Sequence, residues 1–215
     1  MTGGRSETMS DDGNALRGLY AVTPDGLTGA ALYRVAEAAC SGGARLLQYR
    51  NKSGDAAVRR ADADALRAIT AVCGTGFIIN DDVELAQAVD ADGVHVGRDD
   101  RDPAAARMRL GPRAIIGVSC YDDLGLAHAA RLAGADYVAF GAMFASATKP
   151  AAPPADIRRF AECADLGVAR CAIGGITLAR APALIAAGAD LLAVVSDLFD
   201  ASDVHAQAQA YARLF

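Results

Sequence analysis

Residues 76–100 read GFIINDDVELAQAVDADGVHVGRDD, and the rest of the chain can be arranged around this stretch. Its two mainly apolar runs, residues 77–79 and 94–96, are too short for helices and are flanked by glycine, which is typical of buried parallel strands. The helical pattern of residues 83–89 between them predicts the crossover that joins such strands. Both runs are followed by acidic residues, and parallel neighbours end at the same edge of a sheet. The stretch therefore predicts a strand–helix–strand unit with a polar rim.

Short apolar runs alternate with alanine-rich amphipathic segments from residue 18 onward. Eight strand–helix units in strict alternation favour an α/β fold of the closed (β/α)₈ TIM-barrel type over an open doubly wound sheet. The predicted strands cover residues 18–23, 46–50, 77–80, 93–97, 114–119, 137–141, 171–175 and 191–196. The predicted helical segments cover residues 30–40, 56–72, 83–89, 104–110, 123–132, 155–166, 178–187 and 204–214.

Length and composition restrict the class of protein. The 215 residues fit one catalytic domain, residues 15–215, behind a flexible leader at residues 1–14 that has no apolar period. A net charge of -5 argues against binding nucleic acid or a membrane surface through bulk charge. No apolar run approaches the roughly 20 residues that cross a bilayer. Five cysteines without a C-x-x-C pair indicate reduced thiols that fill the core, and hence a cytoplasmic protein.

Acidic side chains follow the third and fourth predicted strands. Asn80 and Asp81 end one strand, and Asp99 and Asp100 follow the other. Reacting groups in such barrels lie at the carboxyl ends of the strands. Because carboxylate oxygens are the ligands that hard cations prefer, these residues predict a magnesium site.

Cationic side chains follow the second strand. Alternation places Gln48, Arg50 and Lys52 on one face, and Tyr49 and Asn51 on the other. Together with Lys149, the two cations predict capture of a phosphate through charge-assisted hydrogen bonds, in a chain that is acidic overall.

A second phosphate site is predicted after the seventh and eighth strands. Gly174 and Gly175 let the backbone approach an anion closely, and Val195 and Ser196 follow the last strand. The loop at residues 146–150 carries Ser, Thr and Lys donors that could close over a substrate.

His95 lies between two valines in the fourth predicted strand, and we interpret it as a histidine of the core or barrel interior rather than a catalytic base. His128 and His205 fall in helical segments, where a surface position is expected. The sequence has no Ser-His-Asp order, H-E-x-x-H motif, Walker loop or G-x-G-x-x-G after a strand. Hydrolase, zinc-protease and dinucleotide-binding functions therefore lack support.

In their order along the chain these motifs resemble the thiamine-phosphate synthase family, whose members join the pyrimidine and thiazole halves of vitamin B1. The resemblance covers about residues 18–197 and rests on residues 19–23, 48–52, 79–81, 91–97 with 99–100, 116–119, 136–141 with 148–150, and 172–176. It implies a Mg²⁺-dependent transferase of thiamine biosynthesis. Such an enzyme condenses 4-amino-2-methyl-5-hydroxymethylpyrimidine diphosphate with thiazole phosphate, giving thiamine phosphate and pyrophosphate by dissociative substitution.

The resemblance also implies roles for individual residues. The pyrimidine diphosphate is expected to be held by Gln48, Arg50, Lys52, Asn80, Ser119 and Lys149, and Mg²⁺ by Asp81 and Asp100. The thiazole phosphate is expected to be held by Ser146, Ala147, Thr148, Gly175 and the backbone at Val195 and Ser196. We include Tyr49 and Asn51 among the substrate-binding residues. The catalytic task, which is to neutralise the leaving group, is assigned to Arg50, Lys52, Ser119 and Lys149.

Some positions depart from the family's usual pattern. Arg98 replaces a common glutamine and Tyr49 a common aliphatic residue, while the loop after the sixth strand has Ala142, Ala145 and Ser146 in place of Pro, Pro and Thr. Losing two prolines predicts a more mobile loop, which bears on thiazole-phosphate affinity more than on metal binding.

Two alternative functions remain open on the sequence: a thiazole tautomerase paralogue, and a non-catalytic sensor of phosphate ligands. Retention of Arg50, Lys52, Asn80, Asp81 and Lys149 favours the synthase over the tautomerase. We expect small-molecule substrates and no nucleic-acid or membrane partner, and the resemblance is compatible with a homo-oligomer.

Overall fold

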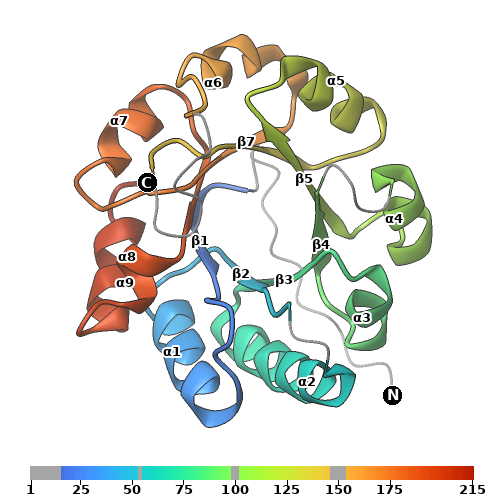
Figure 1. Cartoon of the computed structure of the whole chain (residues 1–215), viewed down its shortest axis with the longest axis vertical. Coiled ribbons are helices and arrows are strands. Elements are labelled where there is room, and N and C mark those ends of the chain that lie inside the picture. The colour runs from blue at the N-terminus through green and yellow to red at the C-terminus, as the bar shows by residue number, and fades with distance from the viewer. Residues whose placement is uncertain (1–15, 53–54, 98–101, 146–153) are drawn as a thin grey trace, which may run out of the picture.

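The computed structural model describes residues 16–52, 55–97, 102–145 and 154–215. In these ranges eight parallel strands form a closed barrel in chain order, and the helices form a ring around it (Figure 1). The barrel closes where β1, Gly18–Val22, pairs with β8, Leu191–Val194, in a register that sets Gly18 opposite Leu191. The predicted TIM-barrel fold is confirmed.

All eight predicted strands are present, with ends that differ by a few residues. Besides β1 and β8, the strands are β2 Leu46–Tyr49, β3 Gly76–Asn80, β4 Gly93–Val96, β5 Ile115–Tyr121, β6 Tyr137–Phe140 and β7 Ala169–Ile173. The helices are α1 Gly29–Ser41, α2 Ala56–Cys73, α3 Val83–Ala88, α4 Pro103–Leu110, α5 Leu124–Leu132, α6 Arg159–Glu162, α7 Ala181–Ala186, α8 Ser196–Phe199 and α9 Val204–Ala212.

Two helical segments are much shorter than predicted, and one short helix was missed. In residues 155–166, α6 gives way to a 3₁₀ turn, Ala164–Leu166, that ends at Gly167 in the left-handed conformation with φ 65°. Helix α7 starts at Ala181 rather than at residue 178, because Pro182 has no N–H and fits best in a first turn. The four-residue helix α8 was not predicted.

The strands separate two cores. Because side chains alternate along a strand, one set packs outward against the helices and the other fills the barrel. The outer core includes Leu19, Leu32 and Phe160. The inner core is made of side chains from Leu16, Tyr20, Val22, Leu46, Ile78, Tyr137, Ala139, Ala169, Cys171, Leu191 and Ala193. Whether a residue faces the helices or the barrel is therefore decided by its position in the alternation.

All five cysteines are free thiols, and four are buried, which agrees with their predicted role as core residues. Among the described residues, no helix combines the length and the apolar character needed to span a bilayer.

Candidate active site

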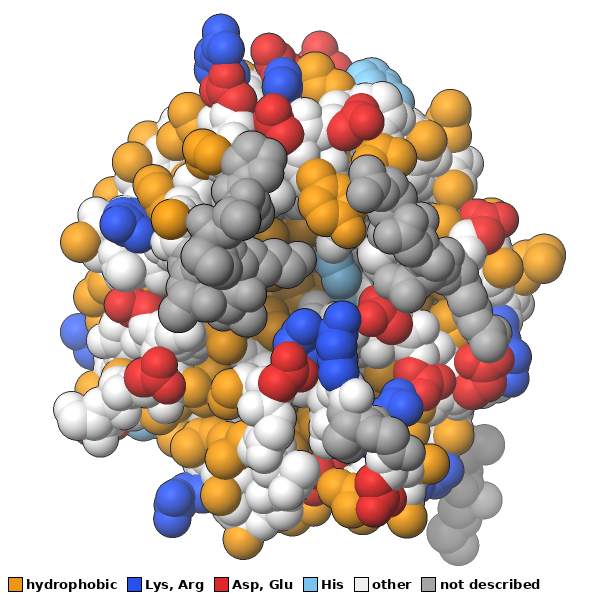
Figure 2. Space-filling model, in the orientation of Figure 1, with side chains coloured by type: hydrophobic (Ala, Val, Ile, Leu, Met, Phe, Trp, Pro, Cys, Tyr) orange, Lys and Arg blue, Asp and Glu red, His pale blue; other side chains and the backbone are white. Residues whose placement is uncertain are grey.

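A cleft of about 480 Å³ lies at the carboxyl ends of β2 and β3. It is lined by Asn51, Lys52, Arg59, Asn80, Asp81, Asp82 and Glu84. Figure 2 shows that this face of the molecule is hollowed near its centre, with cationic and acidic side chains next to one another below the hollow. The cation Lys52 and the carboxylate Asp81, predicted for a phosphate and a metal, thus share one cleft.

Asp81 is held at the rim by its backbone. It follows the last residue of β3 in the left-handed conformation, with φ 63°, and its N–H donates to the carbonyl oxygen of His95 at 2.8 Å. The side-chain amide of Asn80 donates to the Asp81 carboxylate at 2.5 Å. An unusual conformation for a residue other than glycine therefore sets the Asp81 carboxylate beside Asn80.

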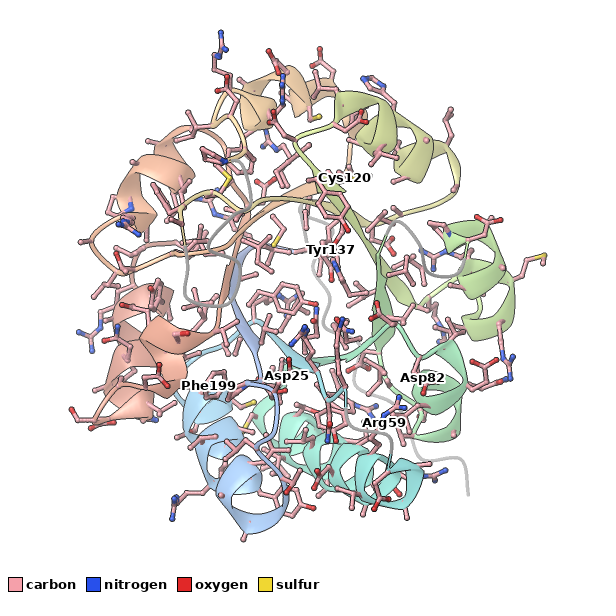
Figure 3. The ribbon with its side chains drawn as sticks, viewed as in Figure 1. Asp25, Arg59, Asp82, Cys120, Tyr137 and Phe199 are labelled. Carbon is pink, nitrogen blue, oxygen red and sulfur yellow. The ribbon has the colours of Figure 1, made fainter. Side chains whose placement is uncertain are left out.

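Asp82, the next residue, forms contacts that hold two helices together. Its carboxylate caps α3 by accepting the backbone N–H of Leu85 at 2.9 Å, and it forms an ion pair with Arg59 of α2. Arg59 and Asp82 lie together where these two helices begin (Figure 3). Asp82 therefore anchors α2 to α3, while Asp81 lines the cleft next to it.

The oxygen atoms at this rim suit a hard cation. Asp81 offers a carboxylate and Asn80 an amide oxygen, and both belong to the ligand types that Mg²⁺ takes. Within the described ranges no group of three or more His, Cys, Asp or Glu side chains could hold a metal ion. The second predicted ligand, Asp100, lies outside the described residues, as do Arg98 and Asp99.

Arg50 stands at the mouth of the barrel, tied to the loop after β1. Its backbone N–H donates to the Thr23 hydroxyl at 2.9 Å, and its guanidinium forms an ion pair with Asp25. Figure 3 shows Asp25 within the ring of strands and helices on this side of the molecule. The arginine predicted to bind a phosphate is thus held in place by a carboxylate from a neighbouring loop.

Tyr49 does not reach the cleft with its side chain. It is 2% exposed and belongs to the outer core, where its hydroxyl donates to Asp62 at 3.2 Å. Desolvation by burial raises the pKa of Tyr49 to about 12. Asn51, which lines the cleft, donates to the Tyr49 hydroxyl at 3.1 Å. Of the two residues added to the substrate-binding set, Asn51 lies in the cleft and Tyr49 supports it from behind.

Asp62 is the centre of a buried cluster behind Tyr49. Besides that phenol, its carboxylate accepts the hydroxyl of Tyr33 at 2.8 Å and the backbone N–H of Gly29 at 2.9 Å. Asp62 is 2% exposed, so these hydrogen bonds compensate for the hydration that its carboxylate loses. The cluster joins α1, α2 and β2.

A chain of hydrogen bonds crosses the barrel interior. The Gln48 amide nitrogen donates to the Tyr20 hydroxyl at 2.6 Å, and the hydroxyls of Tyr20 and Tyr137 lie 2.7 Å apart. Tyr137 bonds to Nδ1 of His95 at 2.9 Å, and Nε2 of His95 bonds to the Ser119 hydroxyl at 2.8 Å. Figure 3 labels Tyr137 inside the ring of strands.

The hydrogen-bond chain explains why the His95 side chain faces the barrel interior. His95 is 7% exposed and its ring stacks on Tyr137 with centroids 5.6 Å apart, which confirms the interpretation of a barrel-facing histidine. Tyr20 and Tyr137 were missed in the sequence, although both alternate inward on their strands. Two predicted substrate contacts, Gln48 and Ser119, are the ends of this chain.

Of the residues predicted for a second phosphate after β7 and β8, Gly174 and Gly175 lie where the loop after β7 packs against the loop after β6. Gly174 and Gly175 have φ 99° and 63°, and a Cβ on Gly175 would lie 2.8 Å from the carbonyl oxygen of Ala145. Arg180 donates to the Gly175 carbonyl at 2.7 Å and stacks over Phe144. Glycine is required here by backbone conformation and by close packing.

Some of the remaining predicted site residues lie within the described ranges, and others lie outside them. Val195 and Ser196 follow β8, and Ser196 is the first residue of α8. Besides Asp100, the predicted site residues outside the described ranges are Ser146, Ala147, Thr148 and Lys149. The leader at residues 1–14 lies outside them as well.

Comparison with known proteins gives one family. Residues 19–198 match the model of the thiamine monophosphate synthase family. The chain is 56% identical over 200 residues to the thiamine-phosphate synthase of Chromobacterium violaceum, an alignment that covers 93% of this chain and 97% of that protein. It is 54% identical over 204 residues to the thiamine-phosphate synthase of Azoarcus sp., covering 94% and 99% of the two chains.

Solved structures agree. The thiamine phosphate pyrophosphorylase of Pyrococcus furiosus superposes with a TM-score of 0.83 at 30% identity, over 94% of this chain and 96% of that one. A 3-hexulose-6-phosphate synthase shares the fold, with a TM-score of 0.68 at 20% identity over 91% and 99% of the chains.

Proposed function

Since the chain belongs to the thiamine monophosphate synthase family, we propose that the cleft at the ends of β2 and β3 is where it joins its two substrates. Its activity is that of a thiamine-phosphate synthase, a transferase that condenses the pyrimidine diphosphate with thiazole phosphate. The observation that carries the assignment of the cleft is the presence of Lys52 and Asp81 on one rim.

The reaction asks for charge neutralisation and positioning. The bond between the pyrimidine methylene carbon and the diphosphate oxygen breaks, and its electron pair leaves with pyrophosphate. The lone pair of the thiazole nitrogen then forms the new C–N bond. Such a step needs no strong base or nucleophile, which fits a site built from cations, amides and a hydroxyl.

In this proposal the cationic side chains neutralise the negative charge of the leaving pyrophosphate. Lys52, Arg50 and Lys149 bind the diphosphate oxygens, and Ser119 donates a hydrogen bond, so these four carry the catalytic role. Gln48, Asn51 and Asn80 orient the pyrimidine half. The thiazole phosphate is held at Gly175 and the backbone of Val195 and Ser196, together with Ser146, Ala147 and Thr148.

Asp81 and Asp100 would hold Mg²⁺, whose chemistry is to neutralise part of the pyrophosphate charge. The carboxylate of Asp81 and the amide of Asn80 support this assignment because they are oxygen ligands on the same rim as Lys52. We assign the enzyme to the cytoplasm on the strength of its five free thiols.

The test is product formation by the purified protein. The pyrimidine diphosphate and thiazole phosphate are incubated with and without Mg²⁺, and products are separated by chromatography. Thiamine phosphate and pyrophosphate that appear in equal amounts, and only with Mg²⁺, support the proposal. Product that forms equally well after exhaustive chelation contradicts the metal assignment.

The two alternatives are less well supported. The tautomerase would act on one half alone, and the sensor would not turn over, whereas relatives above 50% identity over nearly the whole chain are synthases. Conversion of thiazole phosphate alone would indicate the tautomerase. Thermal stabilisation by ligands without product would indicate the sensor.

A further inference from the structure

The hydrogen-bond chain inside the barrel links two residues of the proposed site. Gln48 lies at one end and Ser119 at the other, with Tyr20, Tyr137 and His95 between them. Each of the five residues comes from a different strand. Gln48 is 4% exposed, and the three inner residues are 7% exposed or less, so water has little access to their bonds.

We propose that Tyr20, Tyr137 and His95 are positioning residues, which fix the direction of the hydrogen bonds that Gln48 and Ser119 offer to the pyrimidine diphosphate. This inference rests on the proposed function, since it takes Gln48 and Ser119 as substrate contacts. Contact between the three inner residues and the substrate is not required.

The direction follows from the number of protons. An amide nitrogen can only donate, so Tyr20 accepts from Gln48, and among the described residues the Tyr137 hydroxyl is the acceptor within reach of the single Tyr20 proton. Tyr137 in turn donates to Nδ1 of His95. A neutral imidazole that accepts at Nδ1 carries its proton on Nε2, and therefore donates to Ser119.

The two buried phenols keep the number of protons in the hydrogen-bond chain fixed. Desolvation by burial raises the pKa of Tyr20 and Tyr137 above the ordinary value of 10.0, so both stay protonated at neutral pH. Because each hydroxyl has one proton, reversing one bond requires reversing all the others. The hydrogen bonds can therefore all run in one direction or all in the other, and the orientation of the Gln48 amide selects the direction.

The selected state determines what the substrate meets. With its nitrogen bonded to Tyr20, the Gln48 amide presents its oxygen, an acceptor, on its other side. Since Ser119 accepts from His95, its own proton is directed to a ligand. An acceptor at one end and a donor at the other suit a ligand with an amino group and an acceptor oxygen, which the pyrimidine diphosphate provides.

The first test is the tautomer of His95 in the ligand-free full chain. The protein is labelled with ¹⁵N-histidine, spectra are recorded at about pH 8, where an ordinary histidine is neutral, and a His95→Gln variant identifies the signal. The proposal expects the proton on Nε2. A proton on Nδ1, or on both nitrogens, overturns it.

The second test asks whether Gln48 sets the direction from three hydrogen bonds away. In Gln48→Met the chain has lost its fixed donor, so signals of both His95 tautomers are expected. Leu46→Met, in the same inner core, is the matched control and should keep the wild-type tautomer. An unchanged tautomer in folded Gln48→Met overturns the proposal. If that variant does not fold, Tyr20→Phe gives the same test.

The third test separates positioning from general packing. Tyr20→Phe is expected to raise KM for the pyrimidine diphosphate about fivefold, the value of one hydrogen bond, and to leave KM for thiazole phosphate unchanged. A fall in kcat with both KM values unchanged overturns the proposal. An inactive wild-type protein would refute the proposed function, whereas the tautomer tests need no activity.

Discussion

Asn80 and Asp81 share a hydrogen bond at the end of β3, where the amide of one lies 2.5 Å from the carboxylate of the other. The Asn80 amide nitrogen donates a hydrogen bond to one oxygen of the Asp81 carboxylate and so fixes the orientation of the other oxygen. Asn80 therefore helps to set the direction in which Asp81 presents an oxygen atom to the cleft.

Replacing Asp81 by asparagine should remove metal-dependent turnover without unfolding the protein. Asparagine tolerates the left-handed conformation of this position, so backbone strain does not confuse the result. We expect kcat to fall about 100-fold or more, since a lost metal ion removes several kcal/mol of charge stabilisation. Activity is measured against Mg²⁺ concentration, and folding by circular dichroism.

Asp90→Asn is the matched control, because Asp90 is also an aspartate with positive φ, 53°, but lies beyond the C-terminus of α3. It should keep full activity. A folded Asp81→Asn protein with unchanged Mg²⁺ dependence would show that Asp81 is not a metal ligand.

Lys52→Met should weaken binding of the pyrimidine diphosphate. Losing one charge-assisted bond to phosphate predicts a KM increase of about 10- to 100-fold. Salt should raise KM of the wild type more than that of the variant. Arg60→Met removes an exposed cation that pairs within α2, and equal effects of both substitutions would argue against a specific phosphate contact.

Tyr49→Phe should affect stability more than catalysis. Removing the hydroxyl takes one hydrogen bond from the buried Asp62 carboxylate, so the free energy of unfolding should fall by about 1 kcal/mol. Tyr33→Phe removes another bond to the same carboxylate from α1 and serves as the comparison. Denaturant unfolding and KM are measured for both, and a KM change as large as that of Lys52→Met would contradict this expectation by showing that the Tyr49 hydroxyl acts mainly on substrate binding, through its bond to Asn51.

Acid should weaken the attachment of α6 through Asp122. Hydrogen bonds from Arg159 and from the backbone N–H of Asp156 hold the pKa of this carboxyl below its ordinary value of 3.8. A lowered pKa means that the contribution to stability is present above the ordinary pKa and is lost as pH falls through the folded value. The Tm difference between wild type and Asp122→Asn should therefore shrink in acid, and a constant difference contradicts this assignment.

Buried thiols should resist alkylation. Desolvation by burial raises the pKa of Cys40 and Cys120 to about 12, so few thiolates form at neutral pH. Cys73 is only half-buried and should react first with iodoacetamide. Peptide mass spectrometry of native and denatured protein measures the order, and rapid labelling of Cys120 in the native state would contradict it.

The strands could be predicted because their apolar runs are short and bounded by glycine, and a parallel barrel buries them on both sides. Helix ends were harder. The segment at residues 155–166 has a helical composition, but Asp156 accepts the backbone N–H of Arg158 at 2.9 Å and forms a local turn ahead of α6.

The candidate site was predictable where chemistry is local and not where it depends on long-range pairing. Local patterns were enough to pick out Gln48, Asn80 and Ser119 as candidates, and their roles toward substrate stay predictions. The bond between Tyr20 and Tyr137 joins residues 117 positions apart, and no short pattern reveals it. The position of Tyr49, in contrast, could be predicted from the local pattern, because alternation along the strand places its side chain on the face opposite to Gln48.

Closure of the barrel by β1 and β8 has a consequence for biosynthesis. The ribosome must add about 170 residues after β1 before β8 exists, which takes on the order of ten seconds at typical rates. During that time β1 has an open edge and the nascent barrel is an incomplete sheet. The final pairing of Gly18 with Leu191 therefore makes the first strand translated among the last to complete its hydrogen bonds.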